Sequence, residues 1–226
     1  MKAGGVACTD LVKSFGDPPI DVIRNITLNV KRGDFVAITG RSGSGKSTLL
    51  YLLSGLDVPG SGQVTVDGER LEALSPEDFD SFRNERMGFV FQFHYLLPEL
   101  TALENILMPA RRSGRHLEKK AKAEALLDQF ELSHCRDKVP GKMSGGEQQR
   151  AAIARALILE PHFLFADEPT GNLDSSNGET VMNIFEHVNK TLGTTILMVT
   201  HEPDYAARAR RQIQLVDGVV AEDSDA

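Results

Sequence analysis

Four short runs of apolar residues are separated by longer, helix-like segments. The runs cover residues 35–39, 89–91, 163–166 and 195–200. Strands buried on both faces of a parallel sheet are apolar throughout, so these runs predict such strands. Helices are predicted over 46–55, 76–87, 144–159 and 175–192. This alternation of strands and helices indicates an α/β core around a parallel sheet.

Two other parts of the chain have different patterns. The first 35 residues and residues 61–71 are β-like, with turn signals at Pro59-Gly60 and Asp67-Gly68, and predict an antiparallel layer. Residues 101–159 are helix-rich without a convincing strand, which indicates an inserted helical subdomain. We therefore expect one domain over 1–226, with its core formed by about 1–100 and 160–226. The basic stretch 110–122 is interpreted as a solvated helix face and loop.

Composition narrows the choice of function. The chain has 226 residues, 41% of them hydrophobic, and a formal net charge of −7, which argues against a broad nucleic-acid-binding surface. No run approaches the roughly 18 apolar residues that span a bilayer, so a membrane role would require a partner. Cys8 and Cys135 lack metal-site spacing and are expected to be reduced thiols.

Residues 40–50, GRSGSGKSTLL, join the first predicted parallel strand to a predicted helix. Gly40, Gly45, Lys46 and Ser47 fit the phosphate-binding pattern G-x4-G-K-[ST]. Glycines let backbone N–H groups converge on phosphate oxygens, and the following helix adds its positive end. Lys46 suits the β- and γ-phosphates and Ser47 suits Mg²⁺. The stretch therefore predicts a nucleoside triphosphate site with its metal.

Two adjacent acids, Asp167 and Glu168, follow the apolar run 163–166. Ligands of parallel α/β sheets bind at the carboxyl ends of the strands. There Asp167 can hold Mg²⁺ through water, and Glu168 can orient or deprotonate an attacking water. A helix cap or a surface pair is the alternative, but the preceding phosphate-binding loop favours the functional interpretation.

The stretch MSGGEQQR, 143–150, predicts the start of a helix. Ser144 and Glu147 have the spacing of a capping box. The first N–H groups of such a helix have no intrahelical partner, so the same start also suits an anion. Both interpretations can hold together.

In chain order the phosphate-binding loop comes first, MSGGE second and the two acids last. In that order the three pieces resemble the ATP-binding-cassette (ABC) ATPases over nearly the whole chain. MSGGE is similar to the family signature LSGGQ, and GNLD at 171–174 resembles the D-loop. Gln92 and His201 resemble the Q-loop glutamine and the switch histidine. The resemblance implies a P-loop NTPase (RecA-like) core with an antiparallel β subdomain and an inserted α-helical subdomain. It also implies Mg²⁺-dependent ATP hydrolysis and a head-to-tail homodimer in the ATP-bound state, with each ATP between the loop of one chain and the signature of the other.

The resemblance also assigns residues by position. Catalysis falls to Glu168, His201, Lys46 and Gln92. The metal and its waters fall to Ser47, Gln92 and Asp167. Nucleotide binding falls to the phosphate-binding loop, the signature and single positions elsewhere: Phe15, Gly40, Arg41, Ser42, Gly43, Ser44, Gly45, Lys46, Ser47, Thr48, Gln92, Ser144, Gly145, Gly146, Glu147, Asp174 and His201.

At three positions the residue of this chain differs from the one usual in the family. Phe15 stands where an aromatic residue, often tyrosine, usually stacks on adenine, so stacking is retained without a hydroxyl. Met143 replaces the signature leucine, which is a mild apolar exchange. Glu147 replaces glutamine and adds a negative charge near the phosphate site, or serves locally as the capping carboxylate.

Residues 89–109 and 166–174 resemble a transporter subgroup that includes ATPases of lipoprotein release, macrolide export and cell division. The stretch QFHYLLP, 92–98, favours lipoprotein release. A macrolide- or peptide-efflux ATPase and a cell-division regulator remain alternatives. A soluble ABC ATPase of DNA repair or translation is disfavoured by the single cassette without a long insertion, and a generic P-loop kinase does not explain MSGGE.

The resemblance implies integral-membrane permease subunits as partners and a peripheral position on the cytoplasmic face of the bacterial inner membrane. It implies neither a nucleic-acid partner nor direct insertion into the membrane. The apolar residues of 93–97 are implied to contact the permease, and packing in the hinge of the helical subdomain is the alternative.

Overall fold

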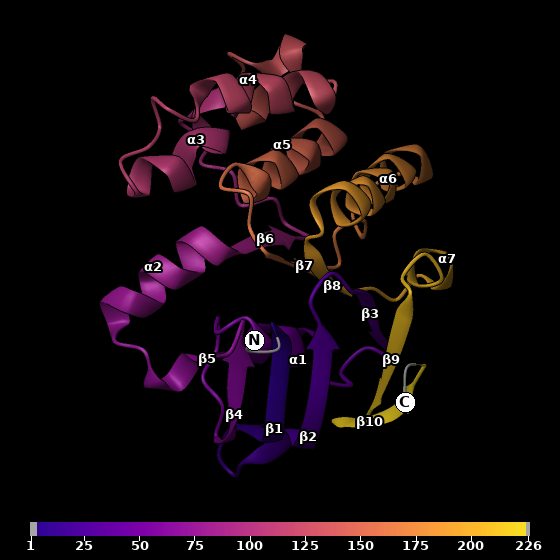
Figure 1. Cartoon of the computed structure of the whole chain (residues 1–226). Coiled ribbons are helices and arrows are strands. Elements are labelled where there is room, and N and C mark those ends of the chain that lie inside the picture. The colour runs from indigo at the N-terminus through magenta and orange to yellow at the C-terminus, as the bar shows by residue number, and fades with distance from the viewer. Residues whose placement is uncertain (1–3, 225–226) are drawn as a thin grey trace.

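The computed structural model describes residues 4–224, so both ends of the predicted 1–226 span lie outside the described residues (Figure 1). The strands are β1 (Gly5–Phe15), β2 (Ile20–Lys31), β3 (Phe35–Gly40), β4 (Ser61–Val66), β5 (Glu69–Arg70), β6 (Met87–Phe91), β7 (Phe163–Asp167), β8 (Thr195–Val199), β9 (Arg211–Val216) and β10 (Val219–Asp223). The α-helices are α1 (Lys46–Leu53), α2 (Pro76–Arg86), α3 (Ala102–Arg112), α4 (Lys120–Gln129), α5 (Gly145–Leu157), α6 (Ser175–Leu192) and α7 (Pro203–Ala206). Short 3₁₀ helices are η1 (Leu71–Ala73), η2 (Ser133–Cys135) and η3 (Pro140–Lys142).

The central sheet has the order β10-β9-β3-β8-β7-β6. β9, β3, β8, β7 and β6 run parallel, and β10 pairs antiparallel with β9 at one edge. The four predicted apolar runs are β3, β6, β7 and β8. The fifth parallel strand, β9, was not predicted, because its residues alternate between buried and exposed and form no continuous apolar run.

The two faces of the central sheet pack into separate cores. Phe163 and Phe165 of β7 lie in the core formed with α1 and the antiparallel sheet. Leu164 and Ala166 lie in the core formed with α3, α5 and α6. Because neighbouring residues of one strand face opposite sides, both faces of the sheet are covered, as a continuous apolar run requires.

The second sheet is antiparallel, with the order β2-β1-β4-β5. It lies opposite the group formed by α3, α4 and α5, with α1 packed between this sheet and the central one (Figure 1). The predicted architecture, a P-loop NTPase core beside an antiparallel layer, is confirmed.

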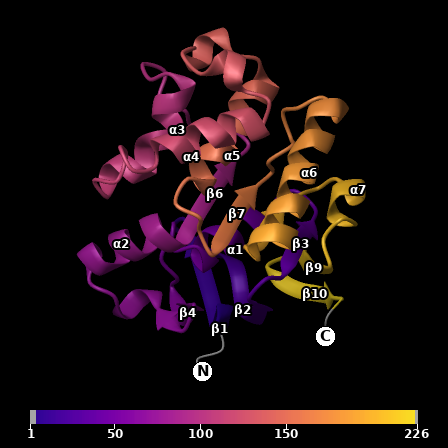
Figure 2. The ribbon, with the colours of Figure 1, turned by 45° about the horizontal axis from the view of Figure 1, so that its top comes forward.

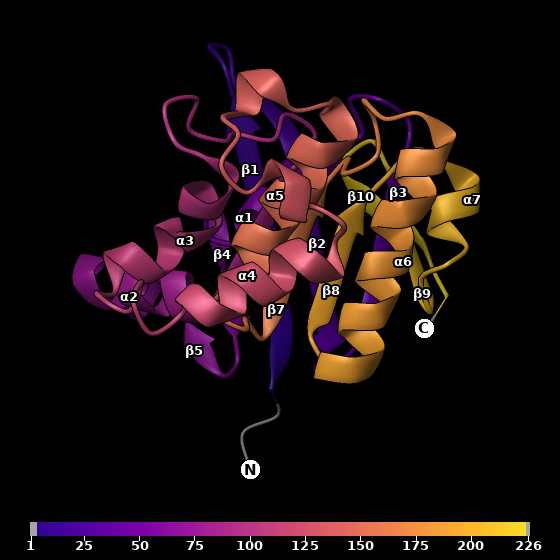
Figure 3. The same cartoon turned by 90° about the horizontal axis from the view of Figure 1, so that it is seen from above.

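The helices between β6 and β7 form a group in which α3 and α4 lie beside α5 (Figures 1 and 3). α6 and α7 lie along the central sheet on the other side of α5 (Figure 2). Within residues 4–224, no helix is both long and apolar enough to cross a membrane.

Candidate functional site

The register of the central sheet brings several of the predicted site residues to one edge. Phe91 pairs with Asp167, and Asp167 pairs with Val199, which also pairs with Ile38 of β3. The carboxyl ends of four parallel strands therefore lie side by side. The segments that leave them carry the phosphate-binding loop, Gln92, Glu168 and His201.

The phosphate-binding loop turns tightly between β3 and α1. A Cβ at Gly40 would lie 2.3 Å from the Leu215 carbonyl oxygen, and Gly43 and Gly45 have φ values of +79° and +100°. Lys46 is buried and its ammonium donates to the carbonyl oxygens of Gly40 and Arg41, each at 3.0 Å. The loop thus folds around its own lysine, as a receptor for a group with several acceptor oxygens would.

Donors for such a group are present in the loop. The buried Ser44 Oγ has no hydrogen-bond partner among the described residues. Helix α1 begins at Lys46 with no capping side chain and no acidic residue in its first turn, so its first N–H groups are available. Arg41, Ser42 and Gly43 are exposed around this opening. The donor set fits phosphate oxygens.

Asp167 is held next to the loop by two hydroxyl groups. The Ser47 hydroxyl donates to Oδ1 at 2.8 Å, and the Tyr51 hydroxyl donates to Oδ2 at 2.6 Å. Burial and the neighbouring Asp167 carboxylate raise the pKa of Tyr51, so the phenol keeps its proton. Hydroxyl and carboxylate oxygens together suit Mg²⁺, so the residues present fit the metal that the fold implies.

Glu168 points away from Asp167. Its backbone adopts φ +48°, and its N–H donates to the Val199 carbonyl at 3.0 Å. Its Oε2 lies 2.9 Å from Nδ1 of His201, which leaves the neighbouring strand β8. A left-handed backbone is uncommon outside glycine, so this turn separates the two carboxylates into different surroundings.

Gln92 lies beside the D-loop. Its amide donates to Oδ1 of Asn172 at 3.2 Å, and Asn172 donates back to the Gln92 carbonyl at 3.2 Å. Asp174 caps α6 by accepting from the Asn177 N–H at 2.8 Å, and the hydrogen bonds from Asn177 lower the pKa of this carboxyl. The structure thus links Gln92 to the D-loop in the same chain.

The predicted capping box at the signature is confirmed. The Ser144 Oγ accepts from the Glu147 N–H at 3.2 Å, and Glu147 Oε2 accepts from the Ser144 N–H at 2.6 Å. Gly146 lies against α6, since a Cβ there would meet the Asn177 amide oxygen at 2.1 Å. Ser144 and Gly145 remain exposed. The start of α5 therefore presents backbone N–H groups to solvent on a part of the chain separate from the phosphate-binding loop (Figure 1).

Two aromatic features lie outside this cluster. Phe15 ends β1 and is 47% exposed, and the Lys13 ammonium lies 4.9 Å from the centroid of its ring. In the segment after Gln92, Phe93 and Tyr95 are 64% and 65% exposed, whereas Leu96 packs against the helical core. Only part of this segment therefore serves hinge packing.

Sequence reasoning missed the residues that support the site. Tyr51 is four residues after Ser47 and so lies on the same face of α1. This spacing could have predicted that Tyr51 lies near the metal site. The Gln149 amide donates to the carbonyls of Phe91 and Pro169, at 3.3 and 2.6 Å, and ties α5 to two of the strand ends. The Gln149 contacts join segments far apart in the chain and have no local sequence signal.

Comparison with known proteins places this geometry in a family. The family model described as "ABC transporter" matches residues 23–171. The lipoprotein-releasing system ATP-binding protein LolD of Leptospira interrogans is 53% identical over 96% of this chain and 90% of its own. The macrolide export ATP-binding/permease protein MacB of Syntrophobacter fumaroxidans is 45% identical over 96% of this chain and 31% of its own.

Solved structures agree with these matches. The ATP-binding cassette MJ0796, in a dimeric post-hydrolysis state bound to ADP and Pi, superimposes with a TM-score of 0.90. It is 38% identical, and the match covers 97% of both chains. The predicted resemblance is confirmed: the chain belongs to the ABC transporter family, as one of its ATP-binding cassettes.

Proposed function

We propose that this protein is the ATP-hydrolysing subunit of a bacterial transporter that releases lipoproteins from the inner membrane through a permease partner. The ATPase assignment is carried by one observation: the strand ends bring the Lys46 loop, Asp167 with Ser47, and Glu168 with His201 to a single edge. The choice of cargo is supported by the 53% identity to the Leptospira LolD protein over most of both chains.

The chemistry follows from where the side chains point. The Lys46 ammonium exchanges its two loop carbonyls for the β- and γ-phosphates. Its hydrogen bonds to charged phosphate oxygens are stronger than those to neutral carbonyl oxygens. Glu168 accepts a proton from the water that attacks the γ-phosphorus, the bond to the bridging oxygen breaks, and ADP and phosphate form. His201 holds the Glu168 carboxylate in place and faces the γ-phosphate.

Ser47, Asp167 and Gln92 would hold Mg²⁺ and its waters; Ser47 and Asp167 are bonded to each other here, and the Gln92 amide is bonded to Asn172. The metal supplies neutralisation of the charge that develops on the phosphate oxygens. Tyr51 keeps Asp167 oriented toward it. Phe15 stacks on the adenine, and its exposed ring is open to such a contact.

The ATP-bound state is a head-to-tail homodimer. The exposed Ser144 and Gly145 of one chain cover the nucleotide held by the loop of the other, and Asp174 lies in the D-loop of the same interface. MJ0796, at 38% identity, was solved as a dimer, which supports this assembly.

The protein acts at the cytoplasmic face of the inner membrane, where the exposed Phe93 and Tyr95 meet a permease subunit. The test is reconstitution of the chain with its candidate permease in proteoliposomes that carry a fluorescent lipoprotein. ATP-dependent release of the lipoprotein to an acceptor is expected, and release must disappear with Lys46→Ala.

Macrolide export is the second candidate, because the MacB relative is 45% identical over nearly all of this chain. In the same vesicles, macrolide-stimulated ATP turnover without lipoprotein release would select it. Stimulation by a division-complex partner alone would select the cell-division role.

A further inference from the structure

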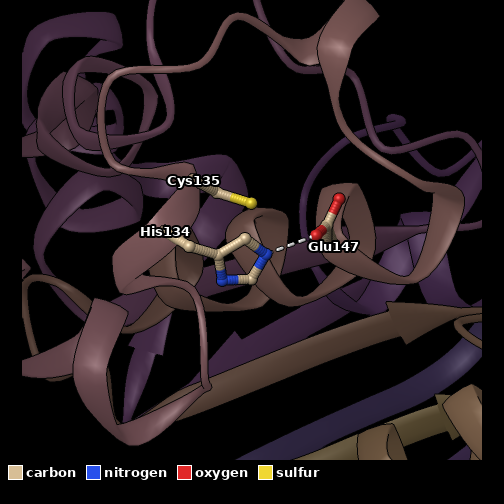
Figure 4. Close-up of side chains that lie close together, drawn as sticks. All are labelled: His134, Cys135 and Glu147. Carbon is tan, nitrogen blue, oxygen red and sulfur yellow. Dashed lines mark hydrogen bonds and ion pairs between the residues drawn. The ribbon is translucent and has the colours of Figure 1, made fainter.

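Three side chains gather beside the start of α5: His134, Cys135 and Glu147 (Figure 4). His134 and Cys135 come from η2, and Nε2 of His134 lies 2.6 Å from Oε1 of Glu147. The other carboxylate oxygen, Oε2, accepts from the Ser144 N–H at 2.6 Å. Each oxygen of Glu147 thus has its own partner.

This cluster is poorly suited to a metal ion. The Lys138 ammonium lies 3.7 Å from the Cys135 sulfur, where it would repel a cation. Burial and the neighbouring Glu147 raise the pKa of the Cys135 thiol, which disfavours the thiolate that a metal needs. His134 and the Ser144 N–H are instead placed to hold the Glu147 carboxylate in one position.

That carboxylate presents an electrostatic problem. Hydrogen bonds from the Ser144 backbone and from His134 lower the pKa of Glu147 to about 2, so the group is fully charged near neutral pH. The signature must nevertheless receive a γ-phosphate, and two anions repel more strongly as they approach. The position of the Glu147 carboxylate therefore decides how much the signature attracts ATP.

We propose that His134 is a positioning residue for the signature. It binds Oε1 on the η2 side of the carboxylate while Oε2 stays on the Ser144 N–H, and so fixes where the negative charge lies relative to a nucleotide bound to a second copy. This inference rests on the head-to-tail dimer of the proposed function.

The test measures ATP-dependent dimerisation of the isolated chain in a Glu168→Gln background. Four proteins are compared: this background alone, with His134→Ala, with Glu147→Gln, and with both. His134→Ala is expected to lower the dimerisation constant about tenfold. Loss of one exposed ion pair, His134 with Glu147, should lower it about threefold, and a symmetric dimer contains two such pairs. With Glu147→Gln present, His134→Ala should change dimerisation less than twofold, since no charge is released.

Two controls separate positioning from folding. His134 has a side chain 58% exposed, so His134→Ala should change the nucleotide-free unfolding equilibrium by no more than the roughly threefold value of one exposed pair. His187→Ala, at an exposed histidine of α6, should leave dimerisation unchanged. An equal loss on His134→Ala with glutamate or glutamine at 147 would overturn the inference while leaving the proposed function intact. If the Glu168→Gln chain itself never dimerises with ATP, the dimer fails and the inference fails with it.

Discussion

Glu168 and His201 meet across two neighbouring parallel strands, with Oε2 of the glutamate 2.9 Å from Nδ1 of the histidine. Asp167, one residue earlier, is bound instead to hydroxyl groups of α1. Adjacent carboxylates thus serve different partners, and the turn at Glu168 makes this separation. In the proposed mechanism, Asp167 serves the metal and Glu168 serves the attacking water.

We expect Glu168→Gln to bind MgATP, to hydrolyse it at least about a hundredfold more slowly, and to accumulate as a closed homodimer. Glutamine keeps the side-chain volume but cannot accept the proton of the attacking water. Undegraded ATP then favours the dimer by mass action. Light scattering with ATP and with ADP measures the assembly, and Ser144→Arg added to the variant should abolish it. Hydrolysis at the wild-type rate would remove Glu168 from catalysis.

Lys46→Ala should strongly reduce steady-state ATP turnover. The loss should correspond to about 3 kcal/mol or more of transition-state stabilisation. The buried ammonium of Lys46 is the charge that the loop encloses. Arg41→Ala is the matched comparison, because it removes an exposed charge from the same loop and should cost much less. Near-normal turnover in a folded Lys46→Ala protein would contradict the site.

Tyr51→Phe tests whether the Tyr51 hydroxyl orients the Asp167 carboxylate. The variant loses the 2.6 Å hydrogen bond to Oδ2 and keeps the ring. Partners of metal ligands typically matter by 10–100-fold in metal affinity, so the Mg²⁺ concentration for half-maximal turnover should rise about tenfold. Binding of ATP in the absence of Mg²⁺ should change little. An unchanged Mg²⁺ dependence would show that Ser47 alone orients Asp167.

The sequence predicted those features that are encoded locally. The apolar runs gave β3, β6, β7 and β8, and the spacing of Ser144 and Glu147 gave the capping box. Strand β9 was not predicted, because only alternate residues are buried there. The contact of His134 with Glu147 also escaped, since it depends on how η2 packs beside α5. Pairings of that kind are set by tertiary packing, which periodicity does not report.

Phe93 and Tyr95 are expected to be the permease contact. Aromatic anchors commonly dominate interfaces, and both rings are mostly exposed here. Replacing both with serine should abolish co-purification with the permease from solubilised membranes and leave ATP binding largely intact. Leu117→Ser, at an apolar side chain 78% exposed, is the matched surface control. Leu96→Ser should instead lower stability, because Leu96 packs against the core. Retained assembly in the double variant would assign the segment to another role.

The pH dependence of stability provides a test of Glu147 without nucleotide. The Ser144 backbone and His134 lower its folded-state pKa from 4.5 to about 2. A depressed carboxyl pKa contributes stability that is complete above the unfolded value and is lost as pH falls toward the folded value. Between pH 5.5 and 4, the unfolded chain takes up a proton here and the folded chain does not. The stability of the wild type relative to Glu147→Gln should therefore fall by about 0.8 kcal/mol over that interval.

All other carboxyl groups are common to the two proteins and cancel to first order. Urea denaturation of each protein at the two pH values gives the four free energies of unfolding that are needed. A constant difference between wild type and variant would mean that the Glu147 carboxylate has ordinary affinity for its proton. The capping box and the contact with His134 would then not hold Glu147 as the structure has them.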